Sequence, residues 1–240
     1  MDLTRTLPLT ALVPVAASLL FSPAAARGQA PVVVGQPMPD FTLPAVQGGE
    51  VTLSSLKGKN VLLIFPRGKS GGGLCHVCHY QYAELTEFDE TQGLRRRHNI
   101  EILFVLPYDR ETVQGWVNAF PAQLQDIENW KNPPDEATLD ARQRARMEAV
   151  RRFYPKKFEY EPGDIPLPFP VLIDAERTVS GAIGLFTTNW GGAEVEQNVP
   201  TVFILDREGM VQFKYHSQTT VDRPGPEYLT RVIEKLVMGG

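Results

Sequence analysis

The chain has 240 residues, of which 42% are hydrophobic and 22% are charged. This is an ordinary globular composition, and the chain is long enough to bury a sizeable core. The net charge is −4 at pH 7 and Lys and Arg form no long stripe, so we expect no binding of nucleic acid.

The first thirty residues resemble a targeting segment. Arg5 precedes the apolar run "LPLTALVPVAASLLF", and "SPAAARGQA" then offers an A-x-A cleavage site that ends at Ala26. This pattern predicts a secretory signal peptide over residues 1–26. An uncleaved anchor is the main alternative, although prolines interrupt the run and it is short for a membrane span. We therefore expect an exported protein, periplasmic or secreted, with no stable membrane insertion after cleavage.

The stretch from residue 31 to residue 106 predicts a hairpin, two strands and a helix. "PDFTLPAV" and "EVTLSSL" flank two glycines and suggest the hairpin, and the apolar runs "NVLLIF" and "IEILFVLPYD" suggest buried strands. "PRGKSGGG" suggests a flexible loop. From Cys75 the spacing of Cys78, Tyr82, Leu85 and Phe88 predicts a helix that buries one face and ends near Gly93.

The remaining sequence predicts a helical insertion followed by a return to the core. Residues 110–168 contain the amphipathic run "DEATLDARQRARMEAVRRFY" and supply no strand-like pattern. "FPVLID" predicts a strand, "RTVSGAIGL" a helix, "VPTVFILD" and "GMVQFKYH" a hairpin, and "PEYLTRVIEKLVM" a closing helix. We expect one domain over residues 31–240, of the α/β class, with a mixed sheet flanked by helices.

The stretch "GGGLCHVCHYQ" holds both cysteines of the chain. Cys75 and Cys78 have the C-x-x-C spacing of a redox dithiol, and a helix N-terminus favours a thiolate. Position predicts that Cys75, at the start of the helix, attacks a substrate disulfide and that Cys78 resolves the mixed disulfide. Arg67 and His76 are candidates for adding positive charge nearby.

Two other chemistries fit the same stretch. C-x-x-C-H is also the attachment motif of c-type haem, with His79 as the proximal ligand, but here it follows an apolar strand in an α/β pattern. The cysteines and their neighbouring histidines provide metal ligands too. However, a His next to each Cys on one helix strains a tetrahedral site, so copper binding would need ligands from a partner. We therefore expect no cofactor and no metal.

Several segments together resemble one known family. "VGQPMPDFTLPAVQGGEVTLSSLKGKNVLLIF", "FPRGKSGGGLCHVCHYQYAEL", "FPVLID", "VPTVFILDREG" and the late "DRP" are similar to the AhpC/TSA redoxin group of the thioredoxin-like superfamily. The resemblance implies a thioredoxin-like fold. It also implies a cis Val199–Pro200 bond that faces the dithiol, with Val199, Pro200 and Thr201 contacting a bound peptide.

The chain departs from the peroxidase pattern P-x-x-x-[TS]-x-x-C of that group. Counting from Pro66 places Gly73 where the cysteine belongs, and no Arg lies beside Asn198 at the start of the late strand. The interpretation favoured by the sequence is therefore a thiol–disulfide oxidoreductase that acts on protein thiols or disulfides with a thiol electron donor. The alternative is a thiol-dependent peroxidase, in which Cys78 takes the peroxidatic position and Cys75 the Thr position.

Overall fold

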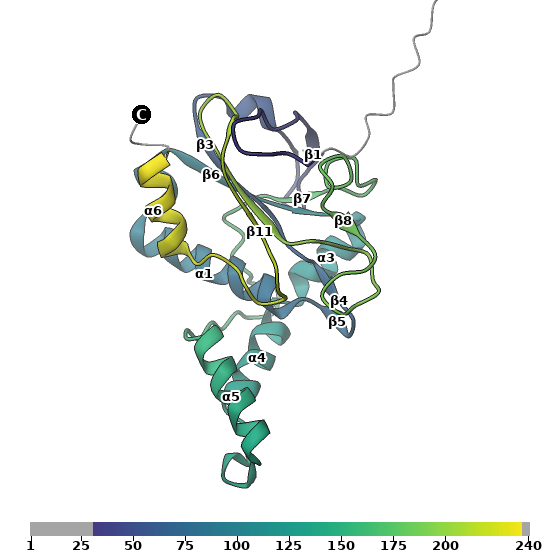
Figure 1. Cartoon of the computed structure of the whole chain (residues 1–240), viewed down its shortest axis with the longest axis vertical. Helices are drawn as coiled ribbons and strands as arrows, with labels where there is room; N and C mark the ends of the chain where they lie inside the picture. The colour runs from purple at the N-terminus through teal and green to yellow at the C-terminus, as the bar shows by residue number, and fades with distance from the viewer. Residues whose placement is uncertain (1–30, 237–240) are drawn as a thin grey trace, which may run out of the picture.

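The protein is built around a five-stranded mixed sheet (Figure 1), seen in a computed structural model that describes residues 31–236. The strand order is β11–β10–β3–β6–β7. β3, β6 and β7 run parallel, whereas β10 is antiparallel to both β3 and β11. The strands are β3 (Asn60–Phe65), β6 (Ile100–Leu106), β7 (Val171–Ile173), β10 (Thr201–Leu205) and β11 (Val211–His216). The predicted α/β class with a mixed sheet is confirmed.

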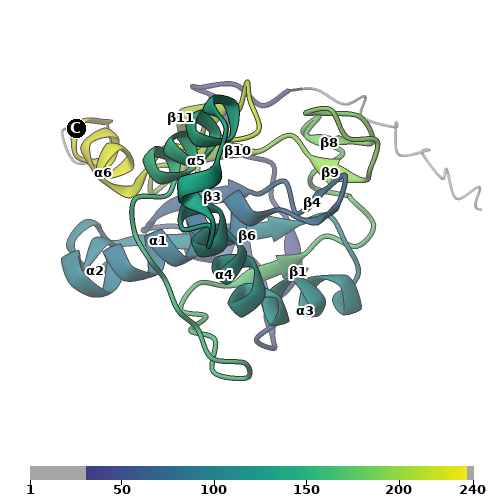
Figure 2. The same cartoon turned by 90° about the horizontal axis from the view of Figure 1, so that it is seen from below.

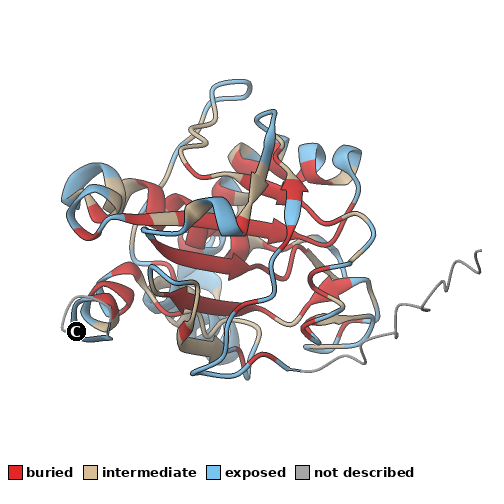
Figure 3. Cartoon of the chain, turned by 90° about the horizontal axis from the view of Figure 1, so that it is seen from above, coloured by how far each residue is buried: buried red, intermediate tan, exposed pale blue. Residues whose placement is uncertain are grey.

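The sheet is buried on both faces, which explains why its strands are continuous apolar runs. In β3, Leu62 and Ile64 join one core cluster, while Val61, Leu63 and Phe65 join the other. Figure 3 shows the central strands as the most buried part of the molecule. Helices α1 (His76–Gln92), α2 (Leu94–His98) and α6 (Pro226–Leu236) contribute to the first cluster. The N-terminal segment and the turns at 179–185 contribute to the second.

Helix α1 follows β3 after a short loop, as predicted. Its C-cap is Gly93, which has a φ of 65°, a left-handed conformation that glycine adopts at little cost. Cys78, Tyr82 and Leu85 are buried on the face that packs against the sheet. The helix therefore begins at the dithiol and fixes it at the carboxyl end of β3.

Three two-stranded hairpins lie outside the central sheet in the described residues. The predicted N-terminal hairpin is β1 (Thr42–Pro44) paired with β2 (Glu50–Thr52), and it is followed by the 3-10 helix η1 (Leu53–Leu56). The sequence predicts a flexible loop before Cys75, but the structure has a tight hairpin there, formed by β4 (Lys69–Ser70) and β5 (Gly73–Leu74). β8 (Phe186–Thr187) pairs with β9 (Gln197–Asn198).

Residues 110–168, between β6 and β7, form helices and supply no strand of the central sheet. The helices are α3 (Arg110–Asn118), α4 (Phe120–Lys131), the 3-10 helix η2 (Glu136–Thr138) and α5 (Ala141–Phe153). The Asp140 side chain caps α5 by accepting a hydrogen bond from the N–H of Gln143, 2.8 Å away. α4 packs against α1, and α5 packs against α4 and projects away from the sheet (Figures 1 and 2).

The helix predicted within "RTVSGAIGL" is wrong, since the chain makes a series of turns there. The buried Asp174 carboxylate accepts hydrogen bonds from the N–H groups of Val179 and Ser180, at 3.2 and 2.8 Å. Arg177 adopts a φ of 56°, which an α-helix does not allow. The Asp174 side chain thus takes the first N–H groups of the segment, and only isolated i→i−4 hydrogen bonds follow, from Gly181 to Arg177 and from Ile183 to Val179.

The predicted signal peptide lies outside the described residues. Among the helices within residues 31–236, none has the length and apolar character needed to cross a membrane.

Candidate functional site

The two thiols lie at the first turn of α1. Cys75 is the N-cap residue, and the N–H of Cys78 donates a hydrogen bond to its carbonyl oxygen at 3.0 Å. Both cysteines are reduced and buried: Cys75 is 4% exposed and Cys78 is fully buried. The two cysteines thus lie at the start of the helix that the sequence predicts, but neither sulfur is open to bulk solvent.

The surroundings of the thiols make Cys78 the more acidic of the two. Burial raises the pKa of Cys78, but a hydrogen bond from the Cys75 thiol, the charge of Arg223 and backbone N–H groups outweigh burial and lower it to about 7. The same hydrogen bond, together with burial, raises the pKa of Cys75. The thiolate is thus favoured at Cys78, the reverse of the order that position alone predicts.

Arg223 is the cation that the sequence did not identify as a site residue. Its side chain is 6% exposed, and Nη1 donates to the Ser217 hydroxyl at 2.9 Å. Nε and Nη2 are buried and have no hydrogen-bond partner within residues 31–236. The only sequence signal for Arg223 was the late "DRP", which contributed to the family resemblance but assigned no role to this arginine. Arg223 thus presents two unused donors in the neighbourhood of the thiols.

Arg67 and His76 were predicted to add charge to the thiols, but their side chains are held elsewhere. Arg67 Nε donates to Gln197 at 2.5 Å, Nη2 donates to the Trp190 carbonyl at 3.0 Å, and the guanidinium lies over the Trp190 ring. Only the backbone N–H of Arg67, with that of Gly68, lowers the pKa of Cys78. His76 contacts Asp126, with Nε2 3.1 Å from its carboxylate. Arg67 therefore acts through its amide, and His76 links α1 to α4.

Two buried tyrosines complete the surroundings of the dithiol. The Tyr108 hydroxyl accepts from the N–H of Lys69 at 2.9 Å and donates to the Glu196 carbonyl at 2.8 Å, which fixes the loop before Cys75. Tyr154, at the end of α5, is 6% exposed. Burial and then the charges of both thiols raise the pKa of Tyr154, so its hydroxyl stays a neutral donor.

Comparison with known proteins identifies the family of the chain. A family model described as the AhpC/TSA family matches residues 34–214. The chain belongs to the AhpC/TSA family. Members of this family are thiol-dependent oxidoreductases, and so is this protein. No curated protein has a significantly similar sequence.

Two peroxiredoxin structures share the fold of this AhpC/TSA protein. One is a mutant of peroxiredoxin 6 of Arenicola marina, with 12% sequence identity and a TM-score of 0.54, over 85% of this chain and 73% of that one. The other is the reduced 2-Cys peroxiredoxin of Plasmodium vivax, with 20% identity and a TM-score of 0.50, over 84% of this chain and 94% of that one. The thioredoxin-like fold expected from the sequence is thereby confirmed.

The predicted cis Val199–Pro200 bond is wrong for this AhpC/TSA protein, since residues 31–236 contain no cis peptide bond. The segment's polar groups are already paired. The N–H of Val199 donates to the Leu185 carbonyl at 2.8 Å, and the Pro200 carbonyl accepts from Ser217 at 2.9 Å. Thr201 Oγ1 donates to the Val199 carbonyl at 3.0 Å. In this arrangement Val199 has no free N–H to offer a bound peptide.

A haem group does not fit the C-x-x-C-H segment. His79 is fully buried; its Nδ1 lies 3.0 Å from the Cys75 carbonyl and its Nε2 2.9 Å from the Trp116 carbonyl. Neither ring nitrogen is free to bind iron. Within residues 31–236 no three His, Cys, Asp or Glu side chains are grouped as a metal site requires.

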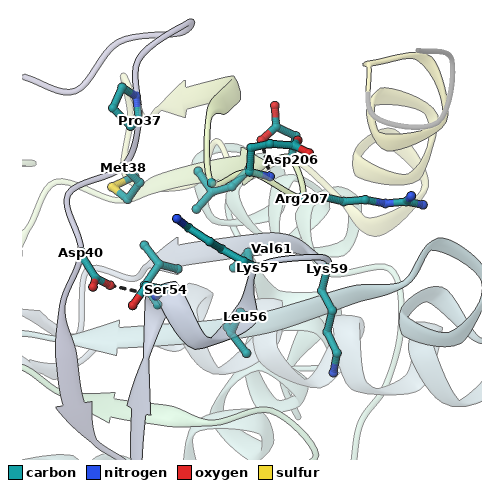
Figure 4. A pocket seen from close by; sticks show the side chains of 14 residues that line it. Pro37, Met38, Asp40, Ser54, Leu56, Lys57, Lys59, Val61, Asp206 and Arg207 are labelled. Atoms are coloured by element: carbon teal, nitrogen blue, oxygen red, sulfur yellow. Dashed lines mark hydrogen bonds between the residues drawn. The ribbon is translucent and has the colours of Figure 1, made fainter.

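A cavity of 210 Å³ lies at the other end of the sheet, between the start of β3 and the turn after β10 (Figure 4). Neither cysteine lines it. The Asp40 carboxylate there accepts a hydrogen bond from the N–H of Ser54 at 2.8 Å. Asp206 accepts from the N–H of Met210, also at 2.8 Å. These carboxylates stabilise turns, and we assign the cavity no role in the redox chemistry.

Proposed function

We propose that the protein is a thiol-dependent peroxidase in which Cys78 attacks the peroxide and Cys75 resolves the product. One observation carries the proposal: the thiol with the lowered pKa shares its surroundings with Arg223, whose buried Nε and Nη2 have no partner within residues 31–236. A buried cation with free donors is suited to bind a peroxide and to stabilise the charge that develops on its oxygens.

The proposed reaction has three steps. The Cys78 thiolate attacks one peroxide oxygen, the O–O bond breaks, and the departing oxygen takes a proton, which leaves Cys78 as a sulfenic acid. The Cys75 thiol attacks the sulfenic sulfur and releases water, so that a Cys75–Cys78 disulfide forms. Two electrons and two protons from a thiol donor then restore the dithiol, with attack on the less buried sulfur, Cys75.

Disulfide exchange through Cys75 is the second candidate. It is favoured by the C-x-x-C pair itself and by the position of Cys75 at the helix N-cap. The low exposure of Cys75 (4%) and Cys78 (0%) weighs against disulfide exchange. A disulfide in a protein substrate is surrounded by its own bulky chain, which must come close enough for the thiolate to reach the sulfur. Hydrogen peroxide needs far less space. Burial of both thiols therefore favours a peroxide as the oxidising substrate.

The proposed function is tested by two parallel assays with dithiothreitol as the donor, one for peroxide consumption and one for reduction of a disulfide-bonded substrate protein. We expect peroxide consumption that Cys78→Ser abolishes. Arg223→Ala should lower kcat/KM for hydrogen peroxide on the order of 10- to 100-fold, as the loss of a charged hydrogen-bond donor predicts. Arg231→Ala, an exposed arginine of α6, is the matched control. Efficient disulfide reduction without peroxide consumption would overturn the proposal.

We further propose that the protein is exported and acts outside the cytoplasm. The apolar run ahead of Ala26 supports this. N-terminal sequencing of material from the native host tests it. A mature chain that starts just after Ala26 is expected, and an intact Met1 in the cytosol would contradict export.

A further inference from the structure

The two residues between the cysteines are both held by the insertion. We call residues 120–154, which comprise α4, η2 and α5, the covering hairpin. His76 contacts α4 twice: Nε2 lies 3.1 Å from an Asp126 carboxylate oxygen, and the two ring centroids of His76 and Trp130 are 4.4 Å apart. The imidazole is therefore held by one helix through two contacts, a polar contact at Nε2 and a tilted contact with the Trp130 ring.

Val77 is held by the other end of the covering hairpin. It packs against a small core made by Tyr80 of α1, Ile127 of α4 and Tyr154 at the end of α5. The rings of Tyr80 and Tyr154 meet edge to face with centroids 4.9 Å apart. Because Val77 lies between the two cysteines, this end of the hairpin packs beside the dithiol.

Burial of the dithiol is unusual for its place in the fold. The N-cap of a helix that follows a loop is commonly open to solvent, yet Cys75 is only 4% exposed. Parts of the hairpin are open to solvent: Phe153 is 54% exposed, and Trp130 is 40% exposed although it contacts His76. α5 touches α4 and projects away from the sheet (Figure 1). The hairpin is anchored in the core at the start of α4 by the buried Phe120 and Leu124, whereas its contact with His76 through Asp126 is partly exposed.

We propose that the covering hairpin is a size filter over the dithiol, and that Asp126 and Trp130, acting through His76, set which substrates reach Cys78. The filter admits hydrogen peroxide and small hydroperoxides and excludes bulky hydroperoxides and protein disulfides. The inference rests on the proposed peroxidase function for its substrates. Its physical content, the access of large and small reagents to Cys78, does not depend on peroxide chemistry.

The test measures alkylation of Cys78 in the reduced Cys75→Ser protein by two reagents, iodoacetamide and a maleimide carried on a polyethylene glycol chain. Asp126→Ala and Trp130→Ala change exposed side chains, so both variants should fold. We expect each to speed the bulky reagent at least about tenfold, the result of a modest shift toward an open hairpin, while the iodoacetamide rate stays nearly unchanged. Asp126→Glu and Trp130→Phe should restore the wild-type ratio.

Matched controls lie on the same hairpin. Phe153→Ala removes a more exposed aromatic ring, and Asp135→Asn removes an exposed carboxylate; neither residue is among the contacts of His76. Both should behave as the parent protein. If Asp126→Ala and Trp130→Ala accelerate both reagents equally, the change lies in thiolate reactivity and the filter is overturned. The filter is also overturned if neither variant accelerates the bulky reagent.

Peroxide kinetics separate this inference from the proposed function. In the Cys75-containing protein, Asp126→Ala and Trp130→Ala should raise kcat/KM for cumene hydroperoxide relative to hydrogen peroxide by about the same factor as the alkylation ratio. If no variant consumes peroxide while the alkylation ratio shifts as expected, the proposed function fails and the filter stands. An unchanged peroxide ratio in an active enzyme would contradict the filter.

Discussion

Cys78 combines complete burial with a lowered pKa, two properties that normally oppose each other. Burial alone raises the pKa of a thiol, so the hydrogen bond from Cys75, the charge of Arg223 and the amides of Arg67 and Gly68 must outweigh it. Because Cys75 donates the hydrogen bond, its own proton is held more tightly. The two thiols therefore differ in pKa before any substrate arrives.

The lowered pKa predicts a pH dependence for the reaction of Cys78. Since the thiolate is the reacting form, the rate should fall about tenfold per pH unit below pH 7 and level off above it. Mass spectrometry of wild-type protein, after brief iodoacetamide treatment at each pH, measures the rate at each cysteine. If Cys75 is modified preferentially, with a midpoint near pH 7, then the thiolate forms at Cys75 and our assignment of it to Cys78 is wrong.

His79 predicts a loss of stability in acid. Burial lowers its pKa to about 4, whereas an unfolded histidine titrates near 6.5. The unfolded state therefore binds the proton first as the pH falls, and stability present above pH 6.5 is lost progressively down to pH 4. Between pH 6.5 and 5 this single group should cost about 1.6 kcal/mol of unfolding free energy.

Chemical denaturation of wild type and His79→Gln at several pH values measures that contribution. The variant removes the titrating group, so its free energy of unfolding should fall less steeply over the same range. Parallel pH curves for the two proteins would contradict the assignment.

At the scale of elements, the β4–β5 hairpin positions the amides that face Cys78. Gly68 has a φ of 79°, and a Cβ atom there would lie 2.5 Å from Cε2 of Tyr108. Gly68→Ala should therefore destabilise the fold by about 1–3 kcal/mol through backbone strain and raise the pKa of Cys78. Denaturation and pH-dependent alkylation measure both effects. Gly72→Ala, which meets nothing within 4 Å, should change neither, and an unperturbed Gly68→Ala protein would contradict this role.

The sequence predicted those elements whose formation depends on local pattern. The continuous apolar runs became β3 and β6, and the spacing of Cys78, Tyr82 and Leu85 became the buried face of α1. The helix expected after β7 failed because the buried Asp174 carboxylate captures the N–H groups that a helix would use. Local propensity could not reveal that competition.

At the scale of the whole molecule, the dithiol could be located from sequence but its surroundings could not. Arg223 and Tyr154 reach the thiols only because the loop before α6 and the end of α5 fold back on α1. No spacing rule connects residues so far apart. The order of the two pKa values depends on the side-chain hydrogen bond between the thiols, a contact that the C-x-x-C spacing permits but does not prescribe.

The most direct test of the account is mass spectrometry of Cys75→Ser and Cys78→Ser after addition of hydrogen peroxide, with a reagent that traps sulfenic acids. Cys75→Ser retains the reacting thiolate and loses the resolving thiol, so it should accumulate a sulfenic acid at Cys78. Cys78→Ser should form none. If instead Cys78→Ser accumulates mixed disulfides with other proteins through Cys75, while Cys75→Ser shows no peroxide-dependent sulfenic acid, then Cys75 is the attacking thiol and the peroxidase account is wrong.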